Sequence, residues 1–139
     1  VNKVIARYGD DLSNKTFAIW GLAFKPNTDD IRAAPSCVTI DALIARGARV
    51  QGYDPKACKA IAAAYEGTEQ VTVFSTKEQA LEGCDALLIC TEWETFRAPD
   101  FARIAELLRS PVIFDGRNLY ERAQLQRHGI VYECIGRPN

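Results

Sequence analysis

Thr16-Phe17-Ala18-Ile19-Trp20-Gly21 is the stretch that decides the fold class, because a short apolar run ends there at a glycine. Such a run, bounded by a turn residue, is typical of a strand that is buried on both faces of a sheet. Residues 22–34 follow as a polar stretch without clean periodicity, and Pro35 then suits the first turn of a helix. A strand, a long loop and a helix in this order indicate the start of an α/β domain.

The same alternation of strand and helix continues to the end of the chain. Short apolar runs predict strands at residues 49–53, 71–74, 86–90 and 112–115, with a last edge strand at 130–134. Helical spacing and caps predict helices at residues 35–46, 55–65, 77–81, 100–108 and 120–127. We therefore expect a three-layer α/β/α, Rossmann-like domain whose mainly parallel sheet has five or six strands in the order 3-2-1-4-5.

Two helices carry predictions about single residues. Apolar residues at helical spacing precede the first strand, namely Val4, Ile5, Tyr8 and Leu12. Asn14 follows them as the expected stop of that helix. The expected buried face of the helix that begins at Pro35 consists of Val38, Ile40, Leu43 and Ile44.

Length and composition fit one globular domain. The chain has 139 residues, of which 47% are hydrophobic and 25% are charged, and its net charge is −1. No basic tract suggests nucleic-acid binding, and no apolar run reaches the roughly 20 residues that cross a bilayer. The first residues do not resemble a secretory signal, so we expect a cytoplasmic protein without membrane or nucleic-acid partners.

The chain contains five cysteines and no methionine. An odd number of cysteines without short paired spacing argues against a disulfide framework and against a zinc site. Cys84 and Cys90 are interpreted as structural residues in a reducing cytosol. The lack of Met leads us to expect a processed or excised piece of a larger protein.

Two cations stand at the carboxyl ends of the predicted strands, where ligands bind in open α/β sheets. Lys25 follows the first strand and Arg117 follows the strand at residues 112–115, so we expect both at one edge of the sheet. Only Gly21 follows the first strand, whereas the dinucleotide fingerprint needs three glycines to bring backbone amides to a pyrophosphate. Side chains must then supply the phosphate contacts, and this cation pair favours an anionic ligand such as a phosphate.

Other polar residues near this edge have structural interpretations that compete with functional ones. Asp54 stands where a Rossmann domain keeps its ribose-binding acid, but we interpret the Asp-Pro pair as a helix cap. Arg32 could simply pair with Asp29 or Asp30 on the same loop.

The remaining candidates point away from catalysis. Trp93 and Phe96 could be core residues that cover the end of a strand, and His128 beside Gly129 is interpreted as a helix cap rather than a base. No Ser-His-acid order is visible, and no cysteine lies in a Gly-rich or basic context that would lower its pKa. The sequence therefore predicts no catalytic residue and no metal site.

Five segments, in the expected order, resemble the UDP-glucose/GDP-mannose dehydrogenase family. They are Gly21-Leu22-Ala23-Phe24-Lys25-Pro26-Asn27-Thr28-Asp29-Asp30-Ile31-Arg32, Tyr53-Asp54-Pro55, Thr91-Glu92-Trp93 with Phe96-Arg97, Phe114-Asp115-Gly116-Arg117-Asn118-Leu119-Tyr120, and Gly136-Arg137-Pro138. The likeness covers nearly the whole chain. The third and fourth segments are most similar to the branch of the family that oxidises UDP-glucose.

The resemblance implies a fragment of an NAD-dependent enzyme that oxidises the C6 alcohol of a nucleotide sugar twice, to the carboxylate, through a cysteine-bound intermediate. Residues 1–14 would be the tail of the interdomain connecting helix, and residues 15–139 the C-terminal UDP-sugar-binding domain. Phe24, Lys25 and Arg117 are implied to bind the substrate. Arg32 is implied to reach the NAD on the other domain, a role that comes only from the resemblance.

The catalytic cysteine motif and the NAD fingerprint of the family are absent, so we expect this chain alone to be inactive. In the full enzyme the implied partners are UDP-glucose, the missing N-terminal NAD-binding domain and further copies in a homo-oligomer. The alternatives are a domain that acts on GDP-mannose or on a UDP-N-acetylhexosamine, and a stand-alone nucleotide-binding module without chemistry.

Overall fold

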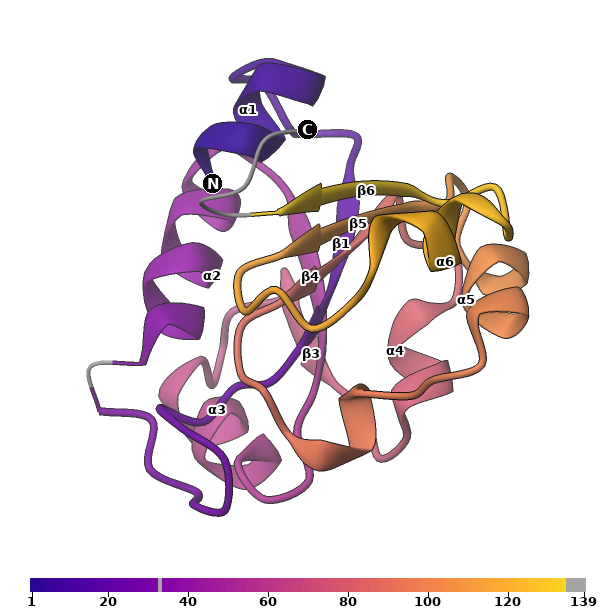
Figure 1. The fold of residues 1–139 in the computed structure, drawn as a ribbon. Coiled ribbons are helices and arrows are strands. Elements are labelled where there is room, and N and C mark those ends of the chain that lie inside the picture. The colour runs from indigo at the N-terminus through magenta and orange to yellow at the C-terminus, as the bar shows by residue number, and fades with distance from the viewer. Residues whose placement is uncertain (33, 135–139) are drawn as a thin grey trace.

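The computed structural model describes residues 1–32 and 34–134, which form three layers (Figure 1). Its strands are β1 (Thr16–Trp20), β2 (Arg49–Tyr53), β3 (Val71–Val73), β4 (Ala86–Ile89), β5 (Val112–Asp115) and β6 (Val131–Cys134). Its α-helices are α1 (Asn2–Tyr8), α2 (Pro35–Ala45), α3 (Cys58–Ala64), α4 (Lys77–Leu81), α5 (Phe101–Leu107) and α6 (Arg122–Gln126). A short 3₁₀ turn, η1 (Glu94–Phe96), follows β4. The segment Gly136-Arg137-Pro138 lies outside the described residues.

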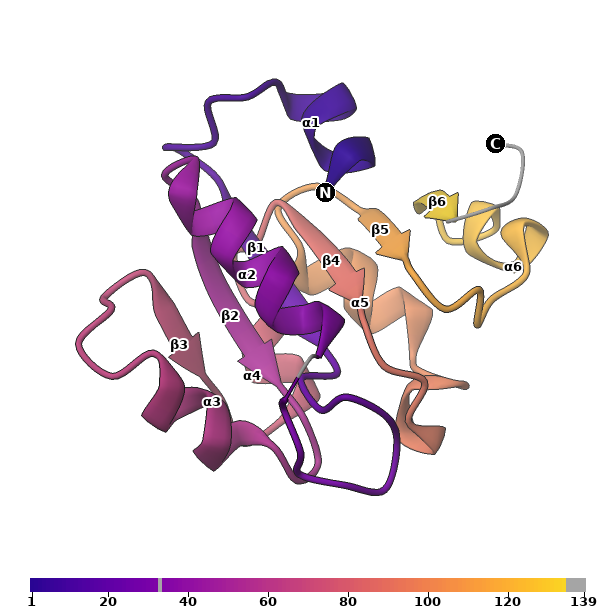
Figure 2. The ribbon, with the colours of Figure 1, turned by 90° about the vertical axis from the view of Figure 1, so that its left-hand side faces the viewer.

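The strands pair in parallel in the order β3-β2-β1-β4-β5-β6. Helices α1, α2 and α3 cover one face of the sheet, and α4, α5 and α6 cover the other (Figure 1 and Figure 2). The predicted fold class and strand order are thus confirmed, with the expected edge strand added beside β5. The order reverses between β1 and β4, so the carboxyl ends of these two strands are where a ligand is expected.

Helices on both faces explain why β1 consists of apolar residues without alternation. Phe17, Ala18, Ile19 and Trp20 are all almost fully buried. The Trp20 ring stacks on Phe96 with centroids 5.2 Å apart, on the side of α4. On the opposite face, the ring of Tyr8 from α1 packs edge-on against Phe17 at 5.7 Å.

The first helix is shorter than its apolar spacing predicts. Helix α1 ends at Tyr8 because Gly9 adopts a positive φ of 86°, a conformation that Gly reaches without cost. Leu12 lies beyond the helix, but it is completely buried and anchors the connection to β1. The expected stop at Asn14 was therefore wrong by several residues.

The prediction that Val38 lies on the buried face of α2 is also wrong, since Val38 is 70% exposed. The buried residues of the helix are Ser36, Ile40 and Leu43, which recur at helical spacing. Val38 follows Ser36 by two positions, about 200° around the helix axis, and therefore faces away from the sheet. The sequence pattern selected Val38 instead because the first buried residue of α2, Ser36, is polar.

None of the helices within residues 1–32 and 34–134 combines the length and the apolar character needed to span a lipid bilayer.

Candidate functional site

The loop that follows β1 is held by the buried carboxylate of Asp54, which is 3% exposed. Its Oδ2 accepts hydrogen bonds from the amides of Leu22 at 2.8 Å and Ala23 at 3.0 Å. The indole Nε1 of Trp93 donates to the same oxygen at 3.0 Å. Oδ1 accepts from the amides of Lys56 and Ala57, both at 2.8 Å. One side chain thus joins the loops after β1, β2 and β4.

The prediction that Asp54 caps the following helix is wrong, because the N-cap of α3 is Ala57 and no side-chain hydrogen bond caps it. The two carboxylate oxygens of Asp54 hold loops instead. Oδ1 holds the turn of residues 55–57, and α3 begins only at Cys58. Oδ2 occupies the two amides that directly follow the first strand and its glycine. In a dinucleotide-binding fold, backbone amides in this region face the pyrophosphate.

Carbonyl groups of the same loop are also satisfied within the protein. The hydroxyl of Ser36 donates to the Leu22 carbonyl, and that of Thr91 donates to the Ala23 carbonyl, each at 2.7 Å. Gly21 packs so closely on Thr91 that an added Cβ would lie 2.6 Å from its backbone nitrogen. The backbone at the carboxyl end of β1 therefore contacts protein, and it leaves no cradle for a dinucleotide.

Beyond Ala23 the loop closes on itself and leaves Phe24 and Lys25 at the surface. The amide of Phe24 donates to the Asp30 carbonyl at 2.7 Å, and the residue is 44% exposed. The Arg32 guanidinium donates to both Asp30 oxygens, at 3.1 and 2.9 Å. These hydrogen bonds, followed by the one from the Arg32 amide, lower the pKa of the Asp30 carboxyl to about 2.

The loop that carries Arg117 is shaped by a second buried carboxylate, that of Asp115 at the end of β5. Its Oδ1 accepts from the Arg117 amide at 2.8 Å, and its Oδ2 accepts from the Leu119 amide at 2.6 Å. The Tyr132 hydroxyl of β6 also donates to Oδ2 at 2.6 Å. Burial, and then this hydrogen bond, raise the pKa of Tyr132. The buried carboxylate of Asp115 therefore fixes the backbone of the turn after β5.

The contacts of the Arg117 guanidinium within the described residues are made by its Nε atom. Its Nε donates to the Cys90 carbonyl at 3.1 Å and lies 3.0 Å from Oε2 of Glu92. Both side chains of this ion pair are about one-third exposed, at 34% for Arg117 and 33% for Glu92. Among the described residues, no hydrogen bond engages the two terminal nitrogens of Arg117.

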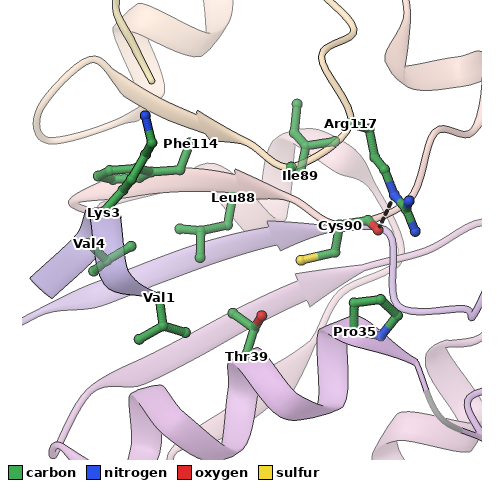
Figure 3. A pocket seen from close by; sticks show the side chains of 11 residues that line it. Val1, Lys3, Val4, Pro35, Thr39, Leu88, Ile89, Cys90, Phe114 and Arg117 are labelled. Atoms are coloured by element: carbon green, nitrogen blue, oxygen red, sulfur yellow. Dashed lines mark hydrogen bonds between the residues drawn. The ribbon is translucent and has the colours of Figure 1, made fainter. Parts of the chain in front are cut away.

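Arg117 stands at the rim of a cleft of about 280 Å³ beside the carboxyl ends of β4 and β5 (Figure 3). The cleft lies on the α1 and α2 side of the sheet, and its other lining residues are Val1, Lys3, Val4, Pro35, Thr39, Leu88, Ile89, Cys90, Phe114 and Gly116. Its walls are mostly apolar, with cationic side chains from Lys3 and Arg117. Such a cavity suits a ligand that has an apolar part and an anionic part.

Arg117 and Lys25 follow parallel strands, so the prediction that they share one edge of the sheet is confirmed. Only Arg117 lines the cleft of Figure 3, however, and Lys25 is not among its lining residues. Phe24 projects to solvent from the same loop as Lys25. Arg32 pairs with Asp30, the structural alternative that the sequence left open, and its side chain is 90% exposed.

The remaining candidates have structural roles. Trp93 and Phe96 are 6% and 0% exposed and cover the end of β4, as their core interpretation predicts. Burial raises the pKa of the Cys90 thiol to about 11 and that of the Cys84 thiol to about 12, which supports their interpretation as structural residues. The interpretation of His128 as the helix cap is wrong by one residue, since the C-cap of α6 is Arg127. His128 is exposed, and its ring lies 5.8 Å from that of Phe101.

Sequence reasoning placed Thr91, Glu92 and Asp115 at strand ends but gave them no role in this site. Asp115 and Thr91 are short polar residues at or just after buried strands, a position that hints at turn capping. The contact of Glu92 with Arg117 joins loops 25 positions apart in the sequence, and no local pattern reveals it. No group of three or more potential metal ligands is found within the described residues.

Comparison with known proteins identifies the family. A model of the UDP-binding domain of the UDP-glucose/GDP-mannose dehydrogenase family matches residues 18–122. The chain belongs to this family. It is 46% identical over 127 residues to a UDP-glucose 6-dehydrogenase of Pseudomonas aeruginosa, and 42% identical over 137 residues to one of Rhizobium meliloti. These matches cover 89% and 99% of the chain but only 28% and 31% of the two relatives.

Solved structures of family members share the fold. A UDP-glucose dehydrogenase from Pyrobaculum islandicum superposes with a TM-score of 0.69 at 28% identity, covering 95% of this chain and 29% of that one. An NDP-N-acetyl-D-galactosaminuronic acid dehydrogenase from Methanosarcina mazei gives a TM-score of 0.78 at 25% identity, covering 98% of this chain and 27% of that one. The family fold thus occurs with different sugars, and the fold alone does not select the sugar.

Proposed function

We propose that this chain is the nucleotide-sugar-binding domain of an NAD-dependent UDP-glucose 6-dehydrogenase, which converts UDP-glucose to UDP-glucuronate. Arg117 binds the diphosphate at the carboxyl edge of the sheet, and Phe24 and Lys25 contact the ligand from the neighbouring loop. Residues 1–14 belong to the helix that leads to the N-terminal domain, and residues 15–139 form the binding domain. The reaction itself takes place with groups of that N-terminal domain.

The observation that carries the proposal is the position of the Arg117 guanidinium. It stands at the rim of the apolar cleft, its Nε donates to the Cys90 carbonyl, and no hydrogen bond from the described part of the chain engages its two terminal nitrogens. Two parallel N–H groups at fixed spacing are the arrangement that binds phosphate oxygens in bidentate fashion. The likeness to UDP-glucose 6-dehydrogenases supports UDP as the nucleotide and glucose as the sugar.

NAD does not fit at the first crossover of this chain. The amides of Leu22 and Ala23 are engaged by Asp54, and Gly21 lies against Thr91. We therefore place NAD on the N-terminal domain of the full enzyme, with Arg32 as the contact from this chain. That enzyme is proposed to be a homo-oligomer in the cytoplasm.

Titration of the 139-residue chain with UDP tests the proposal, with NMR chemical shifts as the readout because they follow weak binding. We expect weak but saturable shifts that include Arg117, and loss of that binding in Arg117→Ala. Arg97→Ala is the matched control, since Arg97 also carries a partly exposed guanidinium and pairs with Glu94 instead of Glu92. Equal UDP affinity of the Arg117→Ala and wild-type chains would remove Arg117 from the site.

Competition between nucleotides separates the proposed substrate from the alternatives. UDP should bind more tightly than GDP, since the Pseudomonas and Rhizobium relatives act on a UDP-sugar by name. In the enzyme with its N-terminal region, UDP-glucose should be oxidised faster than UDP-N-acetylglucosamine. Preference for GDP would instead favour a GDP-mannose dehydrogenase.

A further inference from the structure

Glu92 has no assigned role, and the structure places its carboxylate 3.0 Å from Nε of Arg117, which lines the cleft. We propose that Glu92 is a positioning residue that turns the guanidinium of Arg117 so that its two terminal nitrogens face the diphosphate of the ligand. The inference rests on the proposed function, because it concerns how Arg117 binds phosphate.

The first step of the argument is the geometry of the ion pair. Glu92 Oε2 and the Cys90 carbonyl lie 3.0 and 3.1 Å from the same atom, Nε of Arg117. The single Nε–H donates to the Cys90 carbonyl, and the Glu92 carboxylate lies against the same edge of the guanidinium as an ion-pair partner. A carboxylate that competed with the ligand would instead occupy the two terminal nitrogens, which are the fork that matches phosphate.

The second step is that the backbone of Glu92 is anchored on both sides. Thr91 is fully buried and donates to the Ala23 carbonyl at 2.7 Å. Trp93 is 6% exposed, and its indole donates to Asp54 at 3.0 Å. Glu92 is thus a partly exposed residue between two fixed ones, so its carboxylate offers Arg117 a well-placed acceptor.

The third step is that Arg117 is a long side chain on a fixed turn. Asp115 holds its amide at 2.8 Å, but the side chain itself keeps several rotatable bonds. An arginine that is ordered before the ligand arrives loses less conformational entropy on binding. The Cys90 carbonyl and the Glu92 carboxylate provide this order, and Glu92 is the one of the two that a substitution can remove.

The experiment must separate two effects of Glu92 on UDP affinity. One is the proposed orientation of the Arg117 guanidinium, and the other is the repulsion between the negative charge of Glu92 and the diphosphate. Glu92→Gln and Glu92→Ala both remove the charge, but only Gln keeps a polar oxygen beside the guanidinium. We expect UDP to bind the Ala variant about fivefold more weakly than the Gln variant, the loss that follows from one partly exposed polar contact with a charged group. The measurement is the same NMR titration with UDP.

Glu94 supplies the matched control, because it lies in the same loop, is 94% exposed and pairs with Arg97 instead. Glu94→Ala and Glu94→Gln should bind UDP equally well. A second control uses Arg117→Lys, whose ammonium has no planar fork to orient. In that background the difference in affinity between Glu92→Ala and Glu92→Gln should disappear, which would not happen if Glu92 only stabilised the loop.

The outcomes distinguish this inference from the proposed function. If the wild-type chain shows no saturable shifts with UDP, both fail. If Arg117→Ala abolishes binding while Glu92→Ala and Glu92→Gln bind UDP alike, the function stands and the positioning role of Glu92 is wrong. Tighter binding by Glu92→Ala than by Glu92→Gln would also overturn it.

Discussion

The loop after β1 and the loops after β4 and β5 lie at the same edge of the sheet but use their polar groups in opposite ways. In the first loop, Asp54, Ser36 and Thr91 engage backbone amides and carbonyls close to Gly21. In the second region, Arg117 is held at Nε, and no hydrogen bond from the described residues engages its two terminal nitrogens. The polar groups of the first loop hold the backbone together, whereas those of the second region include the side chain that we propose as the ligand contact.

Under the proposed function, one topology would bind phosphate in two ways. A dinucleotide-binding domain uses glycines so that backbone amides reach a pyrophosphate. Here a carboxylate already occupies the corresponding amides, so an anion must be bound by side chains. Substitutions in the first region should therefore change stability, and substitutions in the second should change ligand affinity.

The largest expected effect on stability comes from Asp54→Ala. It removes the acceptor of five donors, four amides and the Trp93 indole. We expect the free energy of unfolding to fall by about 3–5 kcal/mol, since each buried donor left unpaired costs roughly 1–3 kcal/mol and water can satisfy some of them. Urea denaturation measures the change. Asp29→Ala, at an exposed position of the neighbouring loop, should stay within about 0.5 kcal/mol of wild type.

Thr91→Val tests the same region with a smaller expected change in the free energy of unfolding. The valine keeps the shape of the side chain but removes the hydroxyl that donates to the Ala23 carbonyl at 2.7 Å. Leaving this buried carbonyl without its donor should lower the free energy of unfolding by about 1–2 kcal/mol. Thr72→Val, on the exposed side of β3, is the matched control and should be nearly neutral. Equal stability of the two variants would show that the hydroxyl is not needed.

Sequence reasoning predicted the architecture well because the signals are local. Buried strands such as β1 are continuous apolar runs, and glycines and prolines mark the turns between elements. The strand order follows from short right-handed crossovers in a parallel sheet. The errors concern Gly9, which ends α1 early, and Val38, which faces away from the sheet because a serine takes its place on the buried face.

The site was less predictable because its contacts join distant segments. The position of Arg117 at the edge of the sheet followed from the strand pattern. The second role of Asp54 did not, because Leu22 lies 32 positions earlier and Trp93 lies 39 positions later. A carboxylate has two oxygens, and the sequence shows only the partner that is next to it in the chain.

Arg117→Ala should change stability far less than it changes UDP affinity. Its pair with Glu92 is about one-third exposed, and such pairs contribute little to folding. We expect the free energy of unfolding to remain within about 1 kcal/mol of wild type in the same urea experiment. A loss as large as that of Asp54→Ala would mean that Arg117 is part of the structural network, and the contrast between the two regions would be wrong.

The smallest expected effect is the titration of Asp30, which tests whether the outer part of the first loop is ordered in solution. Hydrogen bonds from Arg32 lower the pKa of Asp30 to about 2. Because this folded-state pKa lies below the ordinary value, the pair stabilises the loop fully at neutral pH. Its contribution is lost as the pH falls from about 4 towards 2.

The carboxyl carbon of Asp30, followed by NMR, should therefore titrate near pH 2 in the wild-type chain. Arg32→Ala should return the midpoint towards the ordinary value of 3.8, whereas Arg97→Ala should leave it unchanged. An ordinary midpoint in the wild-type chain would show that Arg32 is free of Asp30 in solution, and the rigid part of the loop would then end at Ala23.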